Sequence, residues 1–171
     1  MRKSVKLGPV YGILLAVISL FGARPAMAQG SKAELFAGAS FLRNNSTTYS
    51  GWNASVTGNM LPWLGVTADF SGHYNSPLSV YTYTFGPRLA VPQDSGLVPF
   101  TQATFGVARL SAFGAHVNGF GAYIGGGLDW VAKEHIAIRP MQIDAQLTRI
   151  NGSNSSGTRL SFGVVFRLGS R

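Results

Sequence analysis

The sequence has no cysteine among its 171 residues, so no disulfide bond can stabilise its fold. It also has little charge, because Asp, Glu, Lys and Arg together make up 12% of the chain. A strand face that meets water normally carries many Lys and Glu residues, so this content argues against such a face. Beyond the N-terminal stretch, no segment stays apolar over the roughly 18 residues that a membrane helix needs. A helical membrane protein is therefore excluded.

The N-terminal stretch has the three parts of a secretory signal peptide. A basic head over residues 2–6 precedes an apolar run over residues 10–21, and a small-x-small cleavage site follows at residues 26–28. The apolar run is short for a membrane span of roughly 20 residues, which argues against an uncleaved anchor helix. We predict a signal peptide over residues 1–28 and a mature barrel domain over residues 29–171.

Removal of the leader changes the charge balance. The whole chain has a formal charge of +8, whereas residues 29–171 hold ten basic and six acidic residues, a net charge of +4. These basic residues are scattered and form no stripe of the kind that binds nucleic acid. Behind a secretory leader, the surplus indicates anionic lipid headgroups rather than nucleic acid as the partner.

The mature region contains eight runs in which apolar and polar residues alternate with a period of two, the pattern of β-strands with one apolar face. Segments rich in Asn, Ser, Gly and Pro separate them, which predicts a meander of hairpins. The runs cover residues 33–42, 51–60, 63–73, 80–91, 98–110, 119–131, 135–148 and 161–168. In the seventh run the alternation changes phase near Pro140, which predicts a β-bulge.

The polar faces of these runs are made of small, mostly uncharged residues. The sixth run has a face of glycines, which implies that a bulky group is accommodated there or that the sheet curves sharply. No run places a charge in the middle of its apolar face, where a lipid-facing charge would cost roughly 2–4 kcal/mol. This pattern favours lipid outside and polar groups inside. A soluble periplasmic, lipocalin-like barrel that binds an apolar ligand, with the opposite orientation, is an alternative.

The lengths of the runs fit a membrane. Each is about ten residues long, the reach of a tilted strand across the hydrocarbon. Every backbone donor in a bilayer must be paired within the protein, so an even-numbered meander that closes on itself is the available β solution. We predict an all-β fold, an eight-stranded antiparallel up-and-down transmembrane β-barrel. Its termini would lie in the periplasm, with surface loops near residues 44–49, 75–79, 112–118 and 151–156.

The last run resembles the C-terminal targeting strand of bacterial outer-membrane β-barrels. The polar-x-Gly-x-x-apolar-x-apolar pattern is present at Ser161, Gly163, Phe166 and Leu168. In that family the barrel assembly machinery recognises this strand during insertion. The resemblance therefore implies that these four residues form an assembly signal.

The whole mature region is similar to the small OmpA-like or opacity-type eight-stranded barrels of the outer membrane. The leader, the eight runs, the stretches at residues 51–57, 65–74 and 125–130 and the terminal strand carry this resemblance. A full-length OmpA-like protein has a periplasmic peptidoglycan-binding domain after its barrel. Nothing follows Arg171 in this sequence, so we do not expect a cell-wall tethering role.

Isolated charges on the polar faces are the most specific functional feature of the sequence. Side chains fill the lumen of an eight-stranded barrel, so charges there must pair or hold water. We predict a lumen network formed by Glu34, Asp69, Asp129 and Asp144 with Arg88, Arg139, Arg159 and Arg167. Such a network would plug the bore and argues against a diffusion pore. Alternatively, several of these residues lie at the rims and are solvated.

Four aromatic residues lie near the ends of runs, where the interfacial girdles of membrane barrels are found. They are Trp52, Trp63, Tyr81 and Trp130. We predict that they mark the two membrane interfaces, although aromatic residues also cap soluble cores.

The sequence contains no convincing catalytic, cofactor-binding or metal-binding pattern. His73, His116 and His135 are too dispersed for a metal site. Small outer-membrane barrels include lipid-A-modifying enzymes, which need a serine near a histidine at the outer rim. His73 and Ser76 are close in sequence, but no acidic residue is in phase with them. We expect a structural or surface-interaction role, through envelope integrity or contacts of the loops with an unknown ligand, and keep the lipid-A-modifying enzyme as an alternative.

Overall fold

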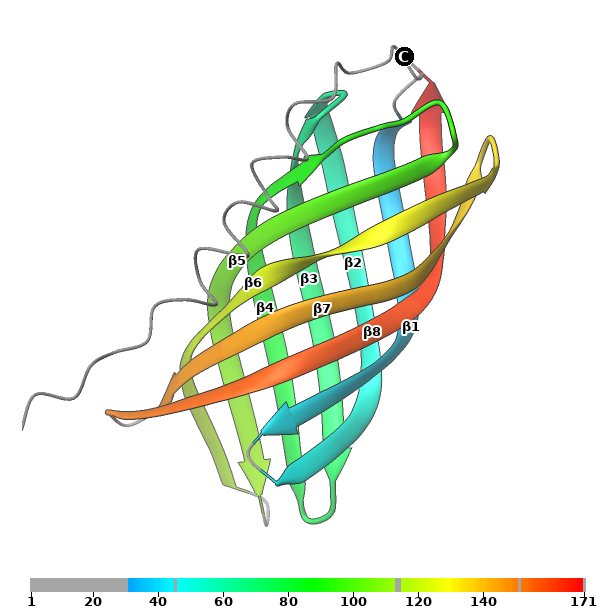
Figure 1. Ribbon diagram of the computed structural model, residues 1–171. Coiled ribbons are helices and arrows are strands. Elements are labelled where there is room, and N and C mark those ends of the chain that lie inside the picture. The colour runs from blue at the N-terminus through cyan, green and yellow to red at the C-terminus, as the bar shows by residue number, and fades with distance from the viewer. Residues whose placement is uncertain (1–30, 45, 113–114, 151, 171) are drawn as a thin grey trace, which may run out of the picture.

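The computed structural model describes residues 31–44, 46–112, 115–150 and 152–170 as a closed barrel of eight antiparallel strands (Figure 1). The strands are β1 (Ser31–Asn44), β2 (Thr47–Leu61), β3 (Leu64–Asn75), β4 (Leu78–Ala90), β5 (Leu97–Ala112), β6 (Ala115–Lys133), β7 (Ile136–Ile150) and β8 (Ser153–Ser170). Each strand pairs with the next, and β8 pairs with β1. The predicted all-β up-and-down fold is confirmed.

The predicted signal peptide lies outside the described residues. Within the described ranges, no helix has the length and apolar character needed to cross a membrane.

The strands are strongly tilted, as Figure 1 shows. A row of cross-strand partners that starts at Ala33 on β1 returns to β1 at Arg43, ten residues farther along. A barrel of eight strands with this stagger has an interior just wide enough for side chains to fill. The identity of the inward-facing residues therefore decides whether the bore is open or filled.

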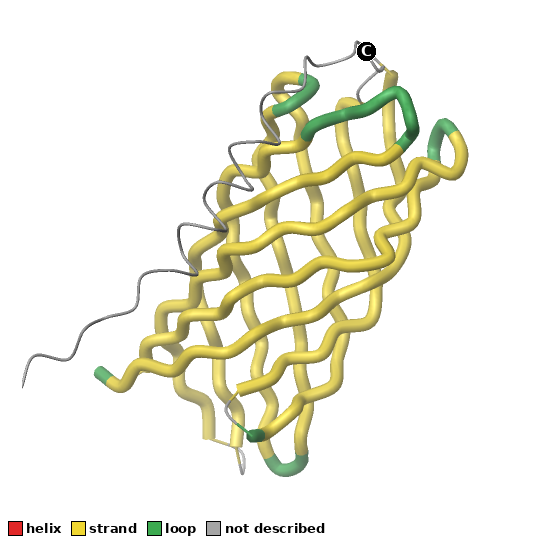
Figure 2. Tube along the Cα trace, viewed as in Figure 1, coloured by secondary structure: helices red, strands yellow, loops and turns green. Residues whose placement is uncertain are grey.

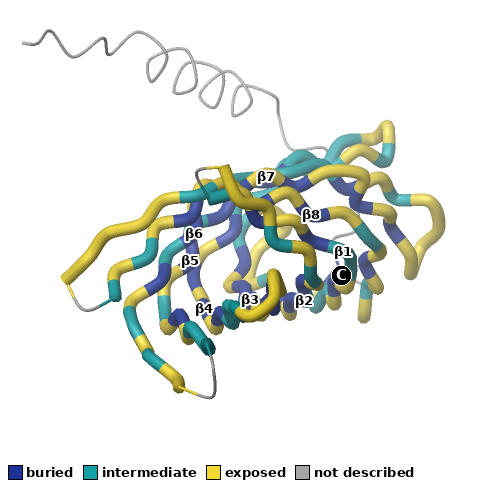
Figure 3. The backbone as a smooth tube through the Cα atoms, turned by 90° about the horizontal axis from the view of Figure 1, so that it is seen from below, coloured by how far each residue is buried: buried dark blue, intermediate teal, exposed yellow. Residues whose placement is uncertain are grey.

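Apolar side chains cover the outside of the barrel and polar side chains fill the inside. Phe70, Ile124 and Phe162 point outward with exposed fractions of 36%, 58% and 44%, whereas Asp69 points inward with an exposed fraction of 1%. Along the strands in Figure 3, buried positions alternate with exposed ones. The predicted orientation is confirmed. It is the reverse of a lipocalin-like barrel, so the soluble alternative is not favoured.

A bulge in β7 changes which residues face the lumen. The register between β7 and β8 shifts between Arg139 and Gln142, as the change of phase near Pro140 predicted. Residues an odd number of positions apart normally lie on opposite faces of a strand. Because of the shift, both Arg139 and Gln142 are buried inside the barrel.

All but one of the connections between strands are two residues long, and the longest, between β4 and β5, has six, so nearly the whole described chain in Figure 2 is strand. We call the end with Ser31 and Ser170 the termini end and the opposite end the hairpin end. At the hairpin end only two residues separate the strands of each pair: β1 and β2, β3 and β4, β5 and β6, and β7 and β8. The prediction of surface loops at residues 44–49, 75–79, 112–118 and 151–156 is wrong in extent, because most of these residues lie in strands. Beyond the apolar band both faces of a strand can be polar, so polar composition alone does not indicate a loop.

The predicted aromatic residues lie at two levels of the outer wall. Trp63 and Trp130 lie near the termini end, in the turn after β2 and near the end of β6. Toward the hairpin end, Trp52 Nε1 donates to the hydroxyl of Tyr74 at 3.1 Å, and the Tyr74 ring lies 5.7 Å from that of Tyr81. Trp52 lies nine positions before Leu61, the last residue of β2 before the turn that holds Trp63, which corresponds to roughly 22 Å along the axis of a barrel with tilted strands. This spacing is close to the roughly 25 Å apolar band of outer-membrane barrels.

A pair of lysine substitutions tests the orientation of the wall. Val56 lies on the outer face about midway between the aromatic levels, and Leu97 lies on the same face at the termini end. In phospholipid vesicles, V56K should lower the free energy of unfolding by roughly 2–4 kcal/mol and L97K by roughly 0–1 kcal/mol, because the cost of a lipid-facing charge depends on its depth. Urea titration followed by tryptophan fluorescence measures both. Equal losses for the two variants would contradict a lipid-facing wall.

Candidate functional site

Three buried arginines meet four carboxylates inside the barrel. The arginines are Arg88 on β4, Arg139 on β7 and Arg159 on β8, and the carboxylates are Glu34 on β1, Asp69 on β3, Asp129 on β6 and Asp144 on β7. We call this set the lumen network. All but Glu34 are buried, and Glu34 is partly exposed at the termini end.

Arg88 crosses the bore to reach two strands that are not its neighbours. Its Nη1 donates to Glu34 Oε2 at 2.9 Å, and its Nη2 donates to Asp129 Oδ2 at 2.6 Å. β4 pairs with β3 and β5, whereas these carboxylates lie on β1 and β6. The guanidinium group therefore ties together opposite parts of the wall.

Arg139 and Gln142, the two residues on either side of the bulge, continue the network. The Nε and Nη2 of Arg139 donate to the two oxygens of Asp129 at 2.6 and 2.9 Å, a bidentate pair. Arg139 Nη1 also donates to Gln142 Oε1 at 2.7 Å, and Gln142 Nε2 donates to Asp144 Oδ2 at 2.8 Å. The bulge thus places the amide that links the two halves of the network.

Arg159 completes the network toward the hairpin end. Its Nη1 and Nη2 donate to the oxygens of Asp69 at 2.6 and 3.2 Å, and its Nε and Nη2 donate to Asp144 Oδ2 at 3.0 and 2.8 Å. Asn53 Nδ2 donates to Asp69 Oδ2 at 3.1 Å. A continuous series of hydrogen bonds therefore runs through the lumen from Glu34 to Asn53.

Aromatic rings lie over each guanidinium group. The Phe100 ring centroid is 4.1 Å from Arg88 Cζ and 4.3 Å from Arg139 Cζ, and the Tyr123 centroid is 4.0 Å from Arg159 Cζ. Phe36 also lies 4.3 Å from Arg139 Cζ. A guanidinium plane can accept an aromatic ring on its face while its edge donates to carboxylates, which suits arginine rather than lysine.

A glycine makes room for one of these rings. A Cβ atom at Gly127 would lie 2.9 Å from Phe100 Cζ and 2.5 Å from the carbonyl oxygen of Met141. Any larger residue there would displace the ring that packs on Arg88 and Arg139. The glycine face of β6 therefore accommodates a bulky group, as the sequence indicated.

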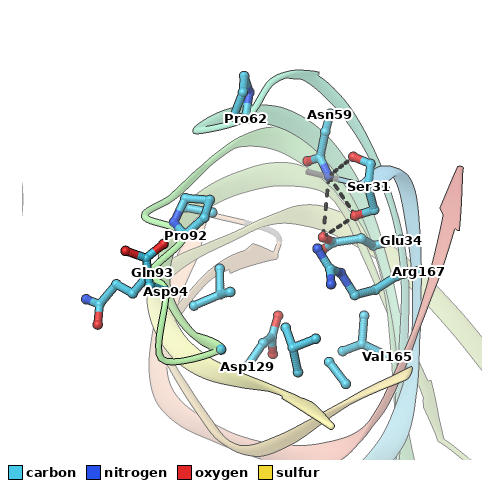
Figure 4. A pocket seen from close by; sticks show the side chains of 15 residues that line it. Ser31, Glu34, Asn59, Pro62, Pro92, Gln93, Asp94, Asp129, Val165 and Arg167 are labelled. Atoms are coloured by element: carbon cyan, nitrogen blue, oxygen red, sulfur yellow. Dashed lines mark hydrogen bonds between the residues drawn. The ribbon is translucent and has the colours of Figure 1, made fainter. Parts of the chain in front are cut away.

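Arg167 is the eighth residue predicted for the network. It lies opposite Glu34 in the register of β1 and β8 and lines a pocket of about 280 Å³ at the termini end (Figure 4). Glu34 and Asp129 also line this pocket, and both are bound by Arg88. The pocket is therefore a mouth that ends at the lumen network.

Sequence reasoning missed several members of the lumen, among them Phe36, Phe100, Tyr123 and Gln142. The three aromatic residues occupy positions of polar parity in their runs, and this exception to the alternation was the signal that could have revealed them. Hydroxyl groups fill the space toward the hairpin end: Ser71 Oγ lies 2.6 Å from Thr82 Oγ1, which in turn contacts the Tyr123 hydroxyl at 3.3 Å.

The structure does not bring His73 and Ser76 together. His73 is buried in the lumen with Nε2 2.9 Å from Ser40 Oγ, whereas Ser76 is exposed in the turn after β3. Ser40 Oγ also lies 3.0 Å from Ser161 Oγ, so its partners are lumen groups. Within the described ranges, His, Asp and Glu side chains do not gather in groups that could hold a metal ion.

Several solved structures have the same architecture, although no protein-family model and no curated protein matches the sequence. Neisserial surface protein A (NspA) aligns with a TM-score of 0.66 at 15% identity, over 81% of this chain and 98% of that chain. The N-terminal β-barrel domain of Pseudomonas aeruginosa OprF aligns with a TM-score of 0.59 at 14% identity, over 81% and 98%. The outer membrane protein OprG from the same organism aligns with a TM-score of 0.53 at 10% identity, over 82% and 97%. The chain therefore has the fold of small eight-stranded outer-membrane β-barrels, as the sequence resemblance indicated.

Removal of Arg159 tests whether the buried charges depend on each other. R159M should lower the free energy of unfolding by about 3–5 kcal/mol, because it leaves Asp69 and Asp144 buried without their cation. The triple variant R159M/D69N/D144N should recover part of the loss, since the orphaned charges are then absent. R109M, at an exposed arginine, is the matched control and should change stability by less than about 0.5 kcal/mol. Urea unfolding in detergent measures all three. A loss in R159M no larger than in R109M would contradict pairing.

Two glycine-to-alanine substitutions, G127A and G58A, test the packing of Phe100. G127A should lower the free energy of unfolding by about 1–3 kcal/mol, because its Cβ overlaps the ring and the neighbouring backbone. G58A is the matched control, since a Cβ there would meet no described heavy atom within 4 Å. Its stability should stay equal or rise by up to about 1 kcal/mol. Thermal unfolding in detergent distinguishes them, and identical behaviour of the two variants would refute the overlap.

Proposed function

We propose that this protein is an outer-membrane barrel with a structural or surface-interaction role and a lumen that does not conduct solutes. The observation that supports this most directly is the lumen network, which crosses the bore between β4 and β1, β4 and β6, and β8 and β3. An open pore needs a water-filled lumen, whereas here buried arginines, carboxylates and aromatic rings occupy it.

The proposed location is the outer membrane, with outer-membrane lipid and lipopolysaccharide as the surrounding partners. The apolar outer wall, its two aromatic levels and the predicted signal peptide support this location. The fold shared with NspA, OprF and OprG supports it as well.

The barrel assembly machinery is the proposed partner during insertion. Phe166 and Leu168 of the terminal strand point outward with exposed fractions of 48% and 47%, so an incoming partner would meet both side chains. Ser161 is buried on the lumen side of the same strand. This division of β8 into two faces supports the role of the strand as an assembly signal.

The short turns at the hairpin end decide which part of the protein could contact another molecule. Only two residues lie between the strands of each hairpin at the hairpin end, so long loops do not provide a binding surface. Polar strand walls such as residues 153–158 extend beyond the apolar band instead. We therefore assign surface contacts to these walls rather than to loops.

Membrane fractionation and gel migration test the proposed location. The full-length protein, expressed in a Gram-negative host, should stay in the membrane pellet after alkaline carbonate and require detergent for extraction. Unboiled samples should migrate differently from boiled samples, because a closed barrel resists dodecyl sulfate until it is heated. Release by carbonate without detergent would support a soluble barrel and contradict the proposal.

Reconstitution into liposomes tests the plugged lumen. Liposomes that contain the protein should not swell in isosmotic solutions of small sugars, whereas a general porin in parallel liposomes provides the positive control. The same preparation, incubated with lipopolysaccharide, should release no acyl chain. Sugar entry would contradict the plug, and acyl release would favour the lipid-A-modifying enzyme.

A further inference from the structure

The outer wall of β7, β8 and β1 carries a polar face at the hairpin end. Arg149 on β7 and Arg43 on β1 lie on either side of β8, which presents Asn154, Ser156 and Thr158 on the same outer side. All five residues are exposed. We call this set the rim face.

The two arginines of the rim face have no internal counter-charge. Within the described ranges, neither guanidinium group takes part in a hydrogen bond or an ion pair. The chain has six acidic residues: four belong to the lumen network, and Asp94 and Glu134 lie in turns at the termini end. The positive charge of the rim face is therefore available to an external anion.

An apolar surface begins directly below the rim face on the same strands. Phe41 and Leu147 precede the two arginines by two residues and so share their outer side. On the antiparallel β8, Leu160 follows Thr158 by two residues and shares its outer side in the same way. The rings of Phe41 and Phe162 stack with centroids 6.2 Å apart. A ligand that contacts both zones must have an anionic head and apolar chains.

We propose that the rim face binds the phosphate-bearing headgroup of an outer-leaflet lipid, while the apolar surface below it contacts the acyl chains. Arginine binds phosphate in a bidentate manner, and the hydroxyl and amide groups of β8 supply neutral donors between the two cations. Two strand spacings and four residues separate Arg43 from Arg149, so their Cα atoms lie on the order of 16 Å apart. That separation suits a headgroup with more than one phosphate, such as lipid A. This inference rests on the proposed outer-membrane location.

Arg109 provides a contrast on the other side of the barrel. It is also exposed on the outer wall near the hairpin end, but its Nε already donates to Asn118 Oδ1 at 3.0 Å. Its cross-strand partners are Tyr81 on β4 and Asn118 on β6, so no second cation lies beside it in the way that Arg43 and Arg149 lie on either side of β8. Its substitution removes one positive charge at the same end without touching the rim face.

Lipid binding to the purified full-length barrel tests this assignment. The protein in non-ionic detergent is titrated with bis-phosphorylated lipid A and with dephosphorylated lipid A, and native mass spectrometry counts the bound lipid. Wild type should prefer the phosphorylated form by about tenfold or more, and R43Q/R149Q should lose that preference, because at least two charge-assisted contacts disappear. R109Q should keep it. R43K/R149K, which retains charge without the bidentate geometry, should fall between wild type and R43Q/R149Q.

Three results would overturn the inference. These are equal binding of both lipids by wild type, equal losses in R109Q and R43Q/R149Q, and displacement of the lipid by millimolar inorganic phosphate, which would indicate a site for free anions. Each variant is first checked for heat-modifiable gel migration. If wild type lacks this migration, the proposed function fails together with the inference. If migration is intact but the preference for phosphate is absent, only the inference fails.

Discussion

The pairing of β8 with β1 is the interaction on which the rest of the molecule depends. It leaves no open sheet edge, so each strand finds a partner on both sides, as a bilayer requires. It also fixes the number of strands and their stagger, and these two quantities set the width of the lumen. Gly38 and Gly163 face each other across this seam, so the inward side of the closure carries no side chain there. The narrow lumen and the tilted wall both follow from this one pairing.

Because the lumen is narrow and the wall faces lipid, the inward-pointing charges of this chain are removed from water. Isolated ions in such a space would be strongly destabilising, so they occur as a network in which each guanidinium group meets carboxylates at its edge and an aromatic ring on its face. Three of its five ion pairs, those of Arg88 with Glu34 and Asp129 and of Arg159 with Asp69, join strands that are not neighbours in the sheet. The network therefore has two consequences, since it fills the bore and ties opposite parts of the wall together.

Function in this barrel is assigned to the wall rather than to the bore or the turns. The bore is occupied, and the turns at the hairpin end are short, so the outer surface is what remains for contact with other molecules. Its apolar band and its polar ends have different chemistry. The rim face borders the apolar band on β7, β8 and β1. An amphiphile with an anionic head and apolar chains therefore fits this region better than a purely polar or apolar ligand.

The sequence by itself determined the number of strands, the face that each one turns to lipid, and the bulge near Pro140. These are local properties, because a period of two or a change in its phase can be recognised within a dozen residues. The sequence also indicated that charges such as Asp69 and Arg159 point inward. Only the tertiary structure decided that Arg159 meets Asp69, ninety positions earlier, that Phe100 packs on two guanidinium groups, and that the polar segments at the hairpin end continue as strands. Partners across a lumen depend on the stagger and closure of the whole sheet, and no local pattern encodes these quantities.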